Sequence, residues 1–337
     1  MKRMRPTLRR TAYRTGILSA ARMPVRQALT VLMFHRVIDP RDPDYAQADP
    51  RYTVSTPLFH ELLAFLSRHY SVVRLQQVLD AVDGRQALPT HAVLITFDDG
   101  WADNIRYAAP LLRQHGMPAA IFVATEAVQS ASFTWWQEEV FTLGRTGALS
   151  DWLNQDERRK QMIGEPANGP DDPLQVVTRL ALMDTNARAG LLASLPHTVR
   201  HSRMMMDANE LRRLPALDIA IGAHGHRHLP LTALSDPAAE LADCRHILTD
   251  LTAGSAVTTA MACPHGRYDA GVLAAVWALG FKLAFTSDPV LNMTEQGMLT
   301  RTRPLGRIPV IEAPIQTGKY RLDPGAAARW LWSRECR

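Results

Sequence analysis

Two adjacent carboxylates, Asp98 and Asp99, follow the apolar run HAVLITF and precede Gly100. Neighbouring acids repel each other, so ionising both of them carries a cost. A bound cation removes that cost, because it lets both carboxylates stay charged. One acid could then hold the metal while its neighbour takes a proton from the metal's water. Taken alone, Asp-Asp-Gly is also a common turn sequence.

Histidines would complete such a metal site, and two pairs lie four residues apart, His197 with His201 and His224 with His228. Either pair could present two imidazoles to one ion. His224 ends the apolar run LDIAIGAH, so we expect it at a strand end, like the carboxylate pair. His197 follows GLLASLP, in a stretch with no other candidate site residue. We therefore expect the second pair to be the ligands, with His226 between them as a hydrogen-bonding loop residue.

One carboxylate and two imidazoles leave coordination positions open for water and substrate. Zn²⁺ fits this ligand set and lowers the pKa of a bound water to around 7. Co²⁺, Ni²⁺ and Fe²⁺ are alternatives with the same ligands. With one carboxylate on the metal, Asp98 becomes the natural general base.

Strand-like and helix-like runs alternate along the rest of the chain. We expect strands at 27–37, 91–97, 119–125, 218–224, 256–266 and 281–287. We expect helices at 56–70, 104–116, 208–214, 236–252 and 271–280. This alternation argues for an α/β fold whose parallel sheet is wound or closed by crossover helices. The C-terminal ends of such strands face the active-site mouth, so the carboxylate pair and His224 should meet there.

The amino-acid composition changes between about residues 130 and 206, where Trp, Gln, Arg and Asp become frequent. Helical spacing in PLQVVTRLALM and NARAGLLASL indicates a helical insertion between strands. We therefore expect three segments along the chain. These are a basic N-terminal arm over 1–29, a catalytic domain over 30–315 that carries the insertion, and a C-terminal tail over 316–337.

The net charge of +5 is concentrated near the start, where residues 1–26 carry eight lysines and arginines and the first acid is Asp39. Such an arm could touch an anionic membrane surface or a phosphorylated substrate, or it could be a solvated terminus. The apolar runs after it are too short for a signal sequence or a spanning helix. We expect a cytoplasmic protein that could associate with a membrane surface, and no nucleic-acid partner.

The combination of TFDDG at a strand end, the spaced histidines of HGHRH and the later ACPHG resembles the polysaccharide deacetylases with a NodB homology domain, carbohydrate esterase family 4. The resemblance covers roughly residues 30–310. It implies a distorted (β/α)7 barrel that hydrolyses an N-acetyl group, or sometimes an O-acetyl group, from a sugar with the help of a divalent metal. The partner would be an acetylated glycan, either a polysaccharide or a lipid-linked saccharide.

Carried over residue by residue, the resemblance makes Asp98 the base and places the metal on Asp99, His224 and His228. In the PHG turn, His265 would donate its backbone N–H to the tetrahedral oxyanion, a contribution of about 3 kcal/mol. Pro264 in that turn and Trp101 after the TFDDG motif would line the substrate pocket. The pair Trp135-Trp136 could stack on sugar faces or fill the core.

The chain departs from the family pattern at three places. Gly225 stands where a Ser or Thr usually supports the metal loop. The arginine that often precedes the Pro motif and orients the base is absent, since Met261 and Ala262 stand there. The late Leu-x-His motif, whose histidine protonates the leaving amine, has no match after FKLAFTS.

The segment RTRPLGRIPV resembles a subgroup in which the order of the motifs is permuted. In that subgroup the acid histidine comes from an early strand, in a segment like LMFHRV. His35 is therefore the candidate general acid, and the alternative is a buried structural histidine.

Three rival functions fit the residues less well. Iron oxygenases share two histidines and one carboxylate, but they use a sheet sandwich and need no second acid. A glycosidase needs two carboxylates several ångströms apart across a cleft. A non-catalytic carbohydrate-binding descendant of the fold would be expected to have lost Asp98 or a metal ligand, and none is lost.

Overall fold

The computed structural model describes residues 23–129, 133, 135–164, 169, 172–196, 203–254, 259–300 and 303–336. Most of the basic arm, residues 1–22, lies outside this part of the chain, as does the alternative histidine pair, His197 and His201. The chain forms two compact units. We call them the barrel unit, which comprises 1–39, 51–131 and 205–337, and the helical unit, which comprises 40–50 and 132–204.

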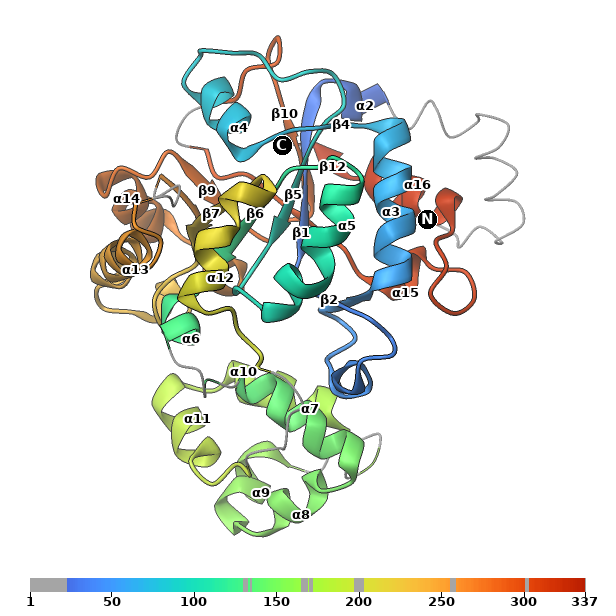
Figure 1. Cartoon of the computed structure of the whole chain (residues 1–337). Helices are drawn as coiled ribbons and strands as arrows, with labels where there is room; N and C mark the ends of the chain where they lie inside the picture. Colours follow the sequence, from blue (N-terminus) through green and yellow to red (C-terminus); the bar gives the residue numbers. More distant parts are fainter. Residues whose placement is uncertain are drawn as a thin grey trace. The chain divides into compact units, whose positions relative to one another are not determined.

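The barrel unit contains one curled sheet with the strand order β12-β10-β1-β5-β6-β7-β8-β9, to which β4 and β11 add at β5 and β1 (Figure 1). Its strands are β1 (Ala28–Phe34), β4 (Ser71–Val72), β5 (Ala92–Phe97), β6 (Ala119–Val123), β7 (Ile219–Ala223), β8 (Ala260–Ala262), β9 (Leu283–Phe285), β10 (Val290–Met293), β11 (Ile308–Pro309) and β12 (Glu335–Cys336). The run from β1 through β5, β6, β7 and β8 to β9 is parallel throughout. The predicted α/β fold is confirmed.

The first predicted strand is interrupted at His35. β1 ends at Phe34, and β2 (Arg36–Ile38) pairs instead with β3 (Thr53–Ser55) in a separate small sheet. The N–H of Asp98 bonds to the carbonyl of Phe34 at 3.0 Å. His35 therefore lies where β1 ends, on the strand next to the carboxylate pair.

Helices surround the curled sheet in the barrel unit (Figure 1). They are α2 (Met23–Arg26), α3 (Thr56–His69), α4 (Leu75–Val82), α5 (Ala109–Gln114), α6 (Thr125–Gln129), α12 (Ala208–Arg213), α13 (Pro237–Leu251), α14 (Ala270–Ala278), α15 (Glu312–Ile315) and α16 (Pro324–Trp332), with a π-helical turn η3 (Asn104–Ala108) before α5. The stretch 316–337, expected as a tail, contains α16, whose Trp332 lies 6.0 Å from the ring of Phe65 on α3.

The strands bury continuous apolar runs, as parallel strands covered on both faces do. All residues of β1, β5 and β6 are buried. The core inside the sheet joins side chains of β1, β5, β6, β8 and β9 to α4, including Leu29, Leu94, Phe122, Phe285 and Leu79. This packing fixes the strands, and so it fixes the direction of the side chains that follow their C-terminal ends.

The helical unit has its own core. It contains α7 (Trp136–Thr146), α8 (Leu149–Asn154), α9 (Glu157–Ile163), α10 (Pro173–Leu182), α11 (Thr185–Leu192) and the short turn η2 (Pro43–Gln47). Trp152, Val140, Val176 and Leu180 are fully buried there, and Trp136 packs against them. Within the described residues of both units, no helix combines the length and the apolar character needed to cross a membrane.

Candidate active site

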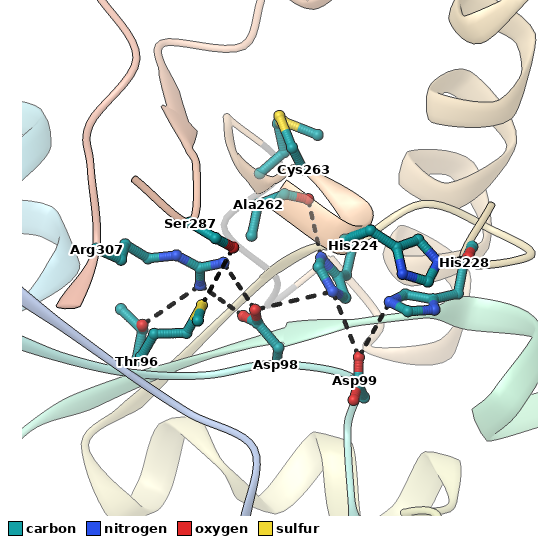
Figure 2. A network of polar contacts seen from close by, with 12 residues as sticks. Thr96, Asp98, Asp99, His224, His228, Ala262, Cys263, Ser287 and Arg307 are labelled. Atoms are coloured by element: carbon teal, nitrogen blue, oxygen red, sulfur yellow. Dashed lines mark hydrogen bonds and ion pairs between the residues drawn. The ribbon is translucent and has the colours of Figure 1, made fainter. Parts of the chain in front are cut away.

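The carboxylate pair follows β5, and His224 follows β7, two strands away in the same parallel sheet. The structure brings Asp99, His224 and His228 together, with one ligand atom from each inside 4.8 Å of the others. Oδ1 of Asp99 lies 3.4 Å from Nε2 of each imidazole (Figure 2). Parallel topology thus places side chains that are far apart in the sequence around one point.

The turn after β5 uses left-handed backbone at two successive residues. Asp99 has φ of 78° and Gly100 has φ of 93°. Aspartate tolerates this region better than most residues, and glycine enters it freely. A Cβ on Gly100 would also lie 3.3 Å from Val123 and Val128. The Asp-Asp-Gly sequence is therefore a sharp turn, and the turn itself presents both carboxylates to the site.

The hydrogen bonds of the ligand candidates leave Oδ1 of Asp99 and Nε2 of both imidazoles facing one another. Nδ1 of His224 lies 2.9 Å from the carbonyl of Ala262. Because a carbonyl only accepts, Nδ1 carries a proton, so Nε2 faces Asp99 and presents a lone pair when the ring is neutral. Oδ1 of Asp99 is buried and has no hydrogen-bond partner among the described residues. A buried carboxylate oxygen left this way is costly, and a cation between it and the two Nε2 atoms would satisfy it.

The charges around this point also suit a cation. Burial alone would raise the pKa of Asp99, but the imidazoles beside it lower that pKa much more, so the carboxylate stays ionised. Burial lowers the pKa of His228 well below its ordinary value, so this ring is neutral, as a metal ligand must be. Burial also lowers the pKa of His224, but the charges of Asp98 and Asp99 outweigh burial and raise it. A cation bound here would replace that proton.

Asp98 has a different partner, which is Arg307. Nη1 and Nη2 of the arginine donate to Oδ1 and Oδ2 of the carboxylate at 2.6 and 2.7 Å (Figure 2). Arg307 is fully buried, and its Nε donates to the carbonyl of Thr286 at 3.0 Å. Burial would raise the pKa of Asp98, but Arg307 and then His224 lower it more. The arginine therefore keeps Asp98 ionised and fixes its orientation.

The sequence analysis missed Arg307. It noted that the usual arginine before the Pro motif is absent, but it did not assign a replacement. Arg307 comes from the other end of the chain, directly before β11, which pairs with β1. The sequence feature that could have revealed Arg307 is the segment RTRPLGRIPV, in which this arginine directly precedes a short apolar strand.

His35 is half-buried at the end of β1, and its carbonyl accepts a hydrogen bond from Nδ2 of Asn104 at 2.8 Å. Its ring centroid lies 4.7 Å from that of Tyr52. Burial raises the pKa of Asp98, whereas Arg307 and then His224 lower it. His35 also lowers this pKa, by a smaller amount. His35 thus follows the strand beside the one that leads to the carboxylate pair, and its role as the acid stays a prediction.

The PHG turn borders the metal ligands. His265 has φ of 56° in the short helix η6 (Pro264–Gly266), and its side chain is exposed. Its ring centroid lies 4.5 Å from that of His228, and its Nε2 lies 3.2 Å from the carbonyl of His228. Pro264 is buried, and a Cβ on Gly225 would lie 3.2 Å from its Cγ. The two loops are in direct contact.

Glu240 on α13 supports the histidine loop, a role the sequence analysis did not assign. Its Oε1 accepts the N–H of Arg227 at 2.5 Å, and its Oε2 accepts Nε of the same residue at 2.9 Å. From the other side, Thr125 contacts Nδ1 of His226 at 2.9 Å. His226 is thus a hydrogen-bonding loop residue, as predicted. The loop is held although Gly225 offers no side chain.

The tryptophans occupy different environments. Trp101 exposes only 4% of its surface, and its Nε1–H donates to Oδ2 of Asp99 at 2.9 Å. Trp135 is buried and precedes α7, and Trp136 begins that helix and packs against the core of the helical unit. These contacts favour core packing for the Trp135-Trp136 pair.

Comparison with known proteins agrees with this geometry. A profile of the family described as polysaccharide deacetylase matches residues 85–284, and the chain belongs to this family. No curated protein sequence matches the chain.

Among solved structures, the deacetylase PplD of Streptococcus pyogenes in complex with acetate is similar over 90% of this chain and 98% of its own, with 17% identity and a TM-score of 0.57. IcaB from Ammonifex degensii is similar over 91% and 98%, with 18% identity and a TM-score of 0.55. The BpsB deacetylase domain from Bordetella bronchiseptica is similar over 84% and 96%, with 16% identity and a TM-score of 0.51. These likenesses confirm the expected (β/α)7 barrel fold, and family membership supports deacetylation of a carbohydrate.

The ion pair of Asp98 leads to a prediction about pH. Replacing Arg307 by Gln removes the charge that opposes burial, so the pKa of Asp98 rises. A carboxylate with a raised pKa is protonated over more of the acidic range. With Asp98 as the predicted base, the acidic limb of the pH profile of kcat/KM should move to higher pH. Arg307→Lys, which keeps a positive charge, should move it less.

The matched control is Arg74→Gln, because Arg74 makes an exposed ion pair with Asp218 away from the site. That variant should retain the wild-type profile. An Arg307→Gln enzyme whose acidic limb coincides with that of the wild type would contradict the role given to the arginine.

Proposed function

We propose that this chain is a metal-dependent hydrolase that removes an N-acetyl group from an amino sugar of a polysaccharide or a lipid-linked glycan. An O-acetyl group is the alternative target. The observation that carries the proposal is the buried Oδ1 of Asp99, which accepts no hydrogen bond from the described residues and lies 3.4 Å from two imidazole Nε2 atoms. Beside it stands a second carboxylate that an arginine holds in place.

The residues that would hold the metal are Asp99, His224 and His228. Zn²⁺ is the ion we favour, since the set of two imidazoles and one carboxylate is one of its common catalytic sites. When bound, such a cation lowers the pKa of water and polarises a carbonyl oxygen. Asp99 and His224 are buried and His228 is half-buried, so little water screens the charge interactions among them.

Asp98 is suited to take the proton of the attacking water. Its Oδ2 lies 3.9 Å from Nε2 of His224, so it borders the metal ligands without joining the set. Both of its oxygens accept from Arg307, which restricts the carboxylate to one orientation. A base held in place in this way avoids the cost of orienting it during the reaction.

Two further groups would act on the acetyl group. The backbone N–H of His265, in the turn beside the metal ligands, would donate to the oxyanion. His35 would protonate the leaving nitrogen, because an amine anion is a very poor leaving group. Its position at the end of β1 places it on the strand next to the one that carries Asp98.

Asp98→Asn tests the base. The amide keeps the size of the side chain but cannot take up a proton. We expect metal content to be unchanged and acetate release from N-acetylglucosamine oligosaccharides to fall by about 10²–10⁴-fold. Asp218→Asn, at the exposed ion pair with Arg74, is the control and should retain activity. Turnover equal to that of the wild type in Asp98→Asn would show that the carboxylate only shapes the turn.

His35→Ala tests the acid. The variant should lose kcat on an N-acetyl sugar while it still binds metal. An activated acetyl ester, whose leaving group needs no proton, should be hydrolysed at a rate much closer to that of the wild type.

The control for His35→Ala is His246→Ala, since His246 is an exposed histidine on α13. It should affect neither substrate. Equal losses of His35→Ala on the amide and on the ester would assign His35 to structure or to substrate binding instead.

The basic arm and the location in the cell remain predictions. We propose that the positive charges of residues 1–26 hold the enzyme at an anionic membrane surface, near a lipid-linked substrate. Each lysine or arginine close to such a surface contributes roughly 1 kcal/mol, which salt screens.

A further inference from the structure

Trp101 distinguishes between the two oxygens of the Asp99 carboxylate. The indole Nε1–H donates to Oδ2 at 2.9 Å, inside the protein. Oδ1 faces the two imidazoles at 3.4 Å and accepts no hydrogen bond from the described residues. The indole therefore determines which oxygen of the carboxylate is offered to a cation.

The backbone at this point makes such an anchor important. Asp99 has φ of 78°, a conformation that aspartate tolerates better than most residues but that still costs energy. The next residue, Gly100, is also left-handed, with φ of 93°. A side chain on this turn has no regular secondary structure to orient it, so the hydrogen bond from the indole supplies that constraint.

The indole is itself held by a buried ion pair. Cζ of Arg36 lies 4.5 Å from the centroid of the Trp101 ring, a cation–π distance. Nε of Arg36 donates to Oδ2 of Asp103 at 2.8 Å. Oδ1 of Asp103 accepts the N–H of Val37 and Nδ2 of Asn104, each at 3.1 Å. This network ties the turn after β5 to β2, the strand that follows His35.

We propose that Trp101 is a positioning residue of the metal centre: its indole N–H, held in place by the Arg36–Asp103 pair, orients Asp99 and so sets the affinity of the site for divalent cations. The inference rests on the proposed function, because it needs the same metal ligands. Partners that hydrogen-bond to a metal ligand typically change metal affinity about 10–100-fold when they are replaced.

Two simpler roles for Trp101 lead to different expectations. A tryptophan that stacks on a sugar needs an accessible face, whereas this ring exposes 4% of its surface and carries Arg36 over it. A tryptophan that only fills space would lose nothing when its N–H is removed and its ring retained. The phenylalanine variant separates positioning from packing.

The experiment is a titration of metal-free Trp101→Phe with Co²⁺, followed by its visible absorption and by calorimetry. Phenylalanine keeps an aromatic ring beneath Arg36 and removes the N–H donor. The matched control is Trp152→Phe in the helical unit. Trp152 is also buried beside an arginine, with Cζ of Arg159 4.2 Å from its ring, but its Nε1 has no hydrogen-bond partner among the described residues.

We expect the Kd for Co²⁺ to rise about 10–100-fold in Trp101→Phe, with an altered absorption band, and to be unchanged in Trp152→Phe. Wild-type affinity and spectrum in Trp101→Phe would overturn the inference and leave the proposed function intact. A wild-type chain that binds no Co²⁺ would overturn both.

Discussion

The structure depends on how two adjacent buried carboxylates are kept charged. Asp98 and Asp99 expose only 2% and 5% of their surfaces. Burying one anion is costly, and burying two side by side adds their repulsion. The fold offsets this cost by giving each carboxylate its own set of partners. Arg307 neutralises Asp98, while the two imidazoles and the indole of Trp101 surround Asp99. Under the proposed function, these different partners suit Asp98 to act as the base and Asp99 to act as a metal ligand.

These partners reach the carboxylates because the sheet is parallel and curled. Arg307 arrives with β11 beside β1, and His224 arrives with β7, two strands from β5. Both contacts join residues more than a hundred positions apart. Helix α13 then stabilises the histidine loop through Glu240, and the turn after β5 is tied to β2 through Arg36 and Asp103. The site is thus built from strand ends. It is fixed by two buried ion pairs, Arg307–Asp98 and Arg36–Asp103, and by the buried Glu240, which pairs with an exposed arginine.

The strands and the residues at their ends could be predicted from the local sequence, because TFDDG and IGAH each end an apolar run with a polar side chain. Arg307 and Glu240 were missed for a physical reason. A buried charge is recognisable only by its partner, and these partners are set by tertiary packing rather than by spacing. Trp101 was assigned to the substrate pocket from its place beside Gly100. That role stays a prediction. The structure adds a hydrogen bond from the indole N–H to Asp99, and the direction in which that N–H points cannot be read from the sequence.

The central claim is that one divalent cation binds between Asp99, His224 and His228. The most direct measurement is the number of Zn²⁺ ions retained per chain after dialysis, determined by mass spectrometry for the wild type, His228→Ala and His197→Ala. We predict one ion in the wild type and in His197→Ala, and a loss of bound zinc in His228→Ala. One ion retained in His228→Ala, or zinc lost from His197→Ala, would contradict the account.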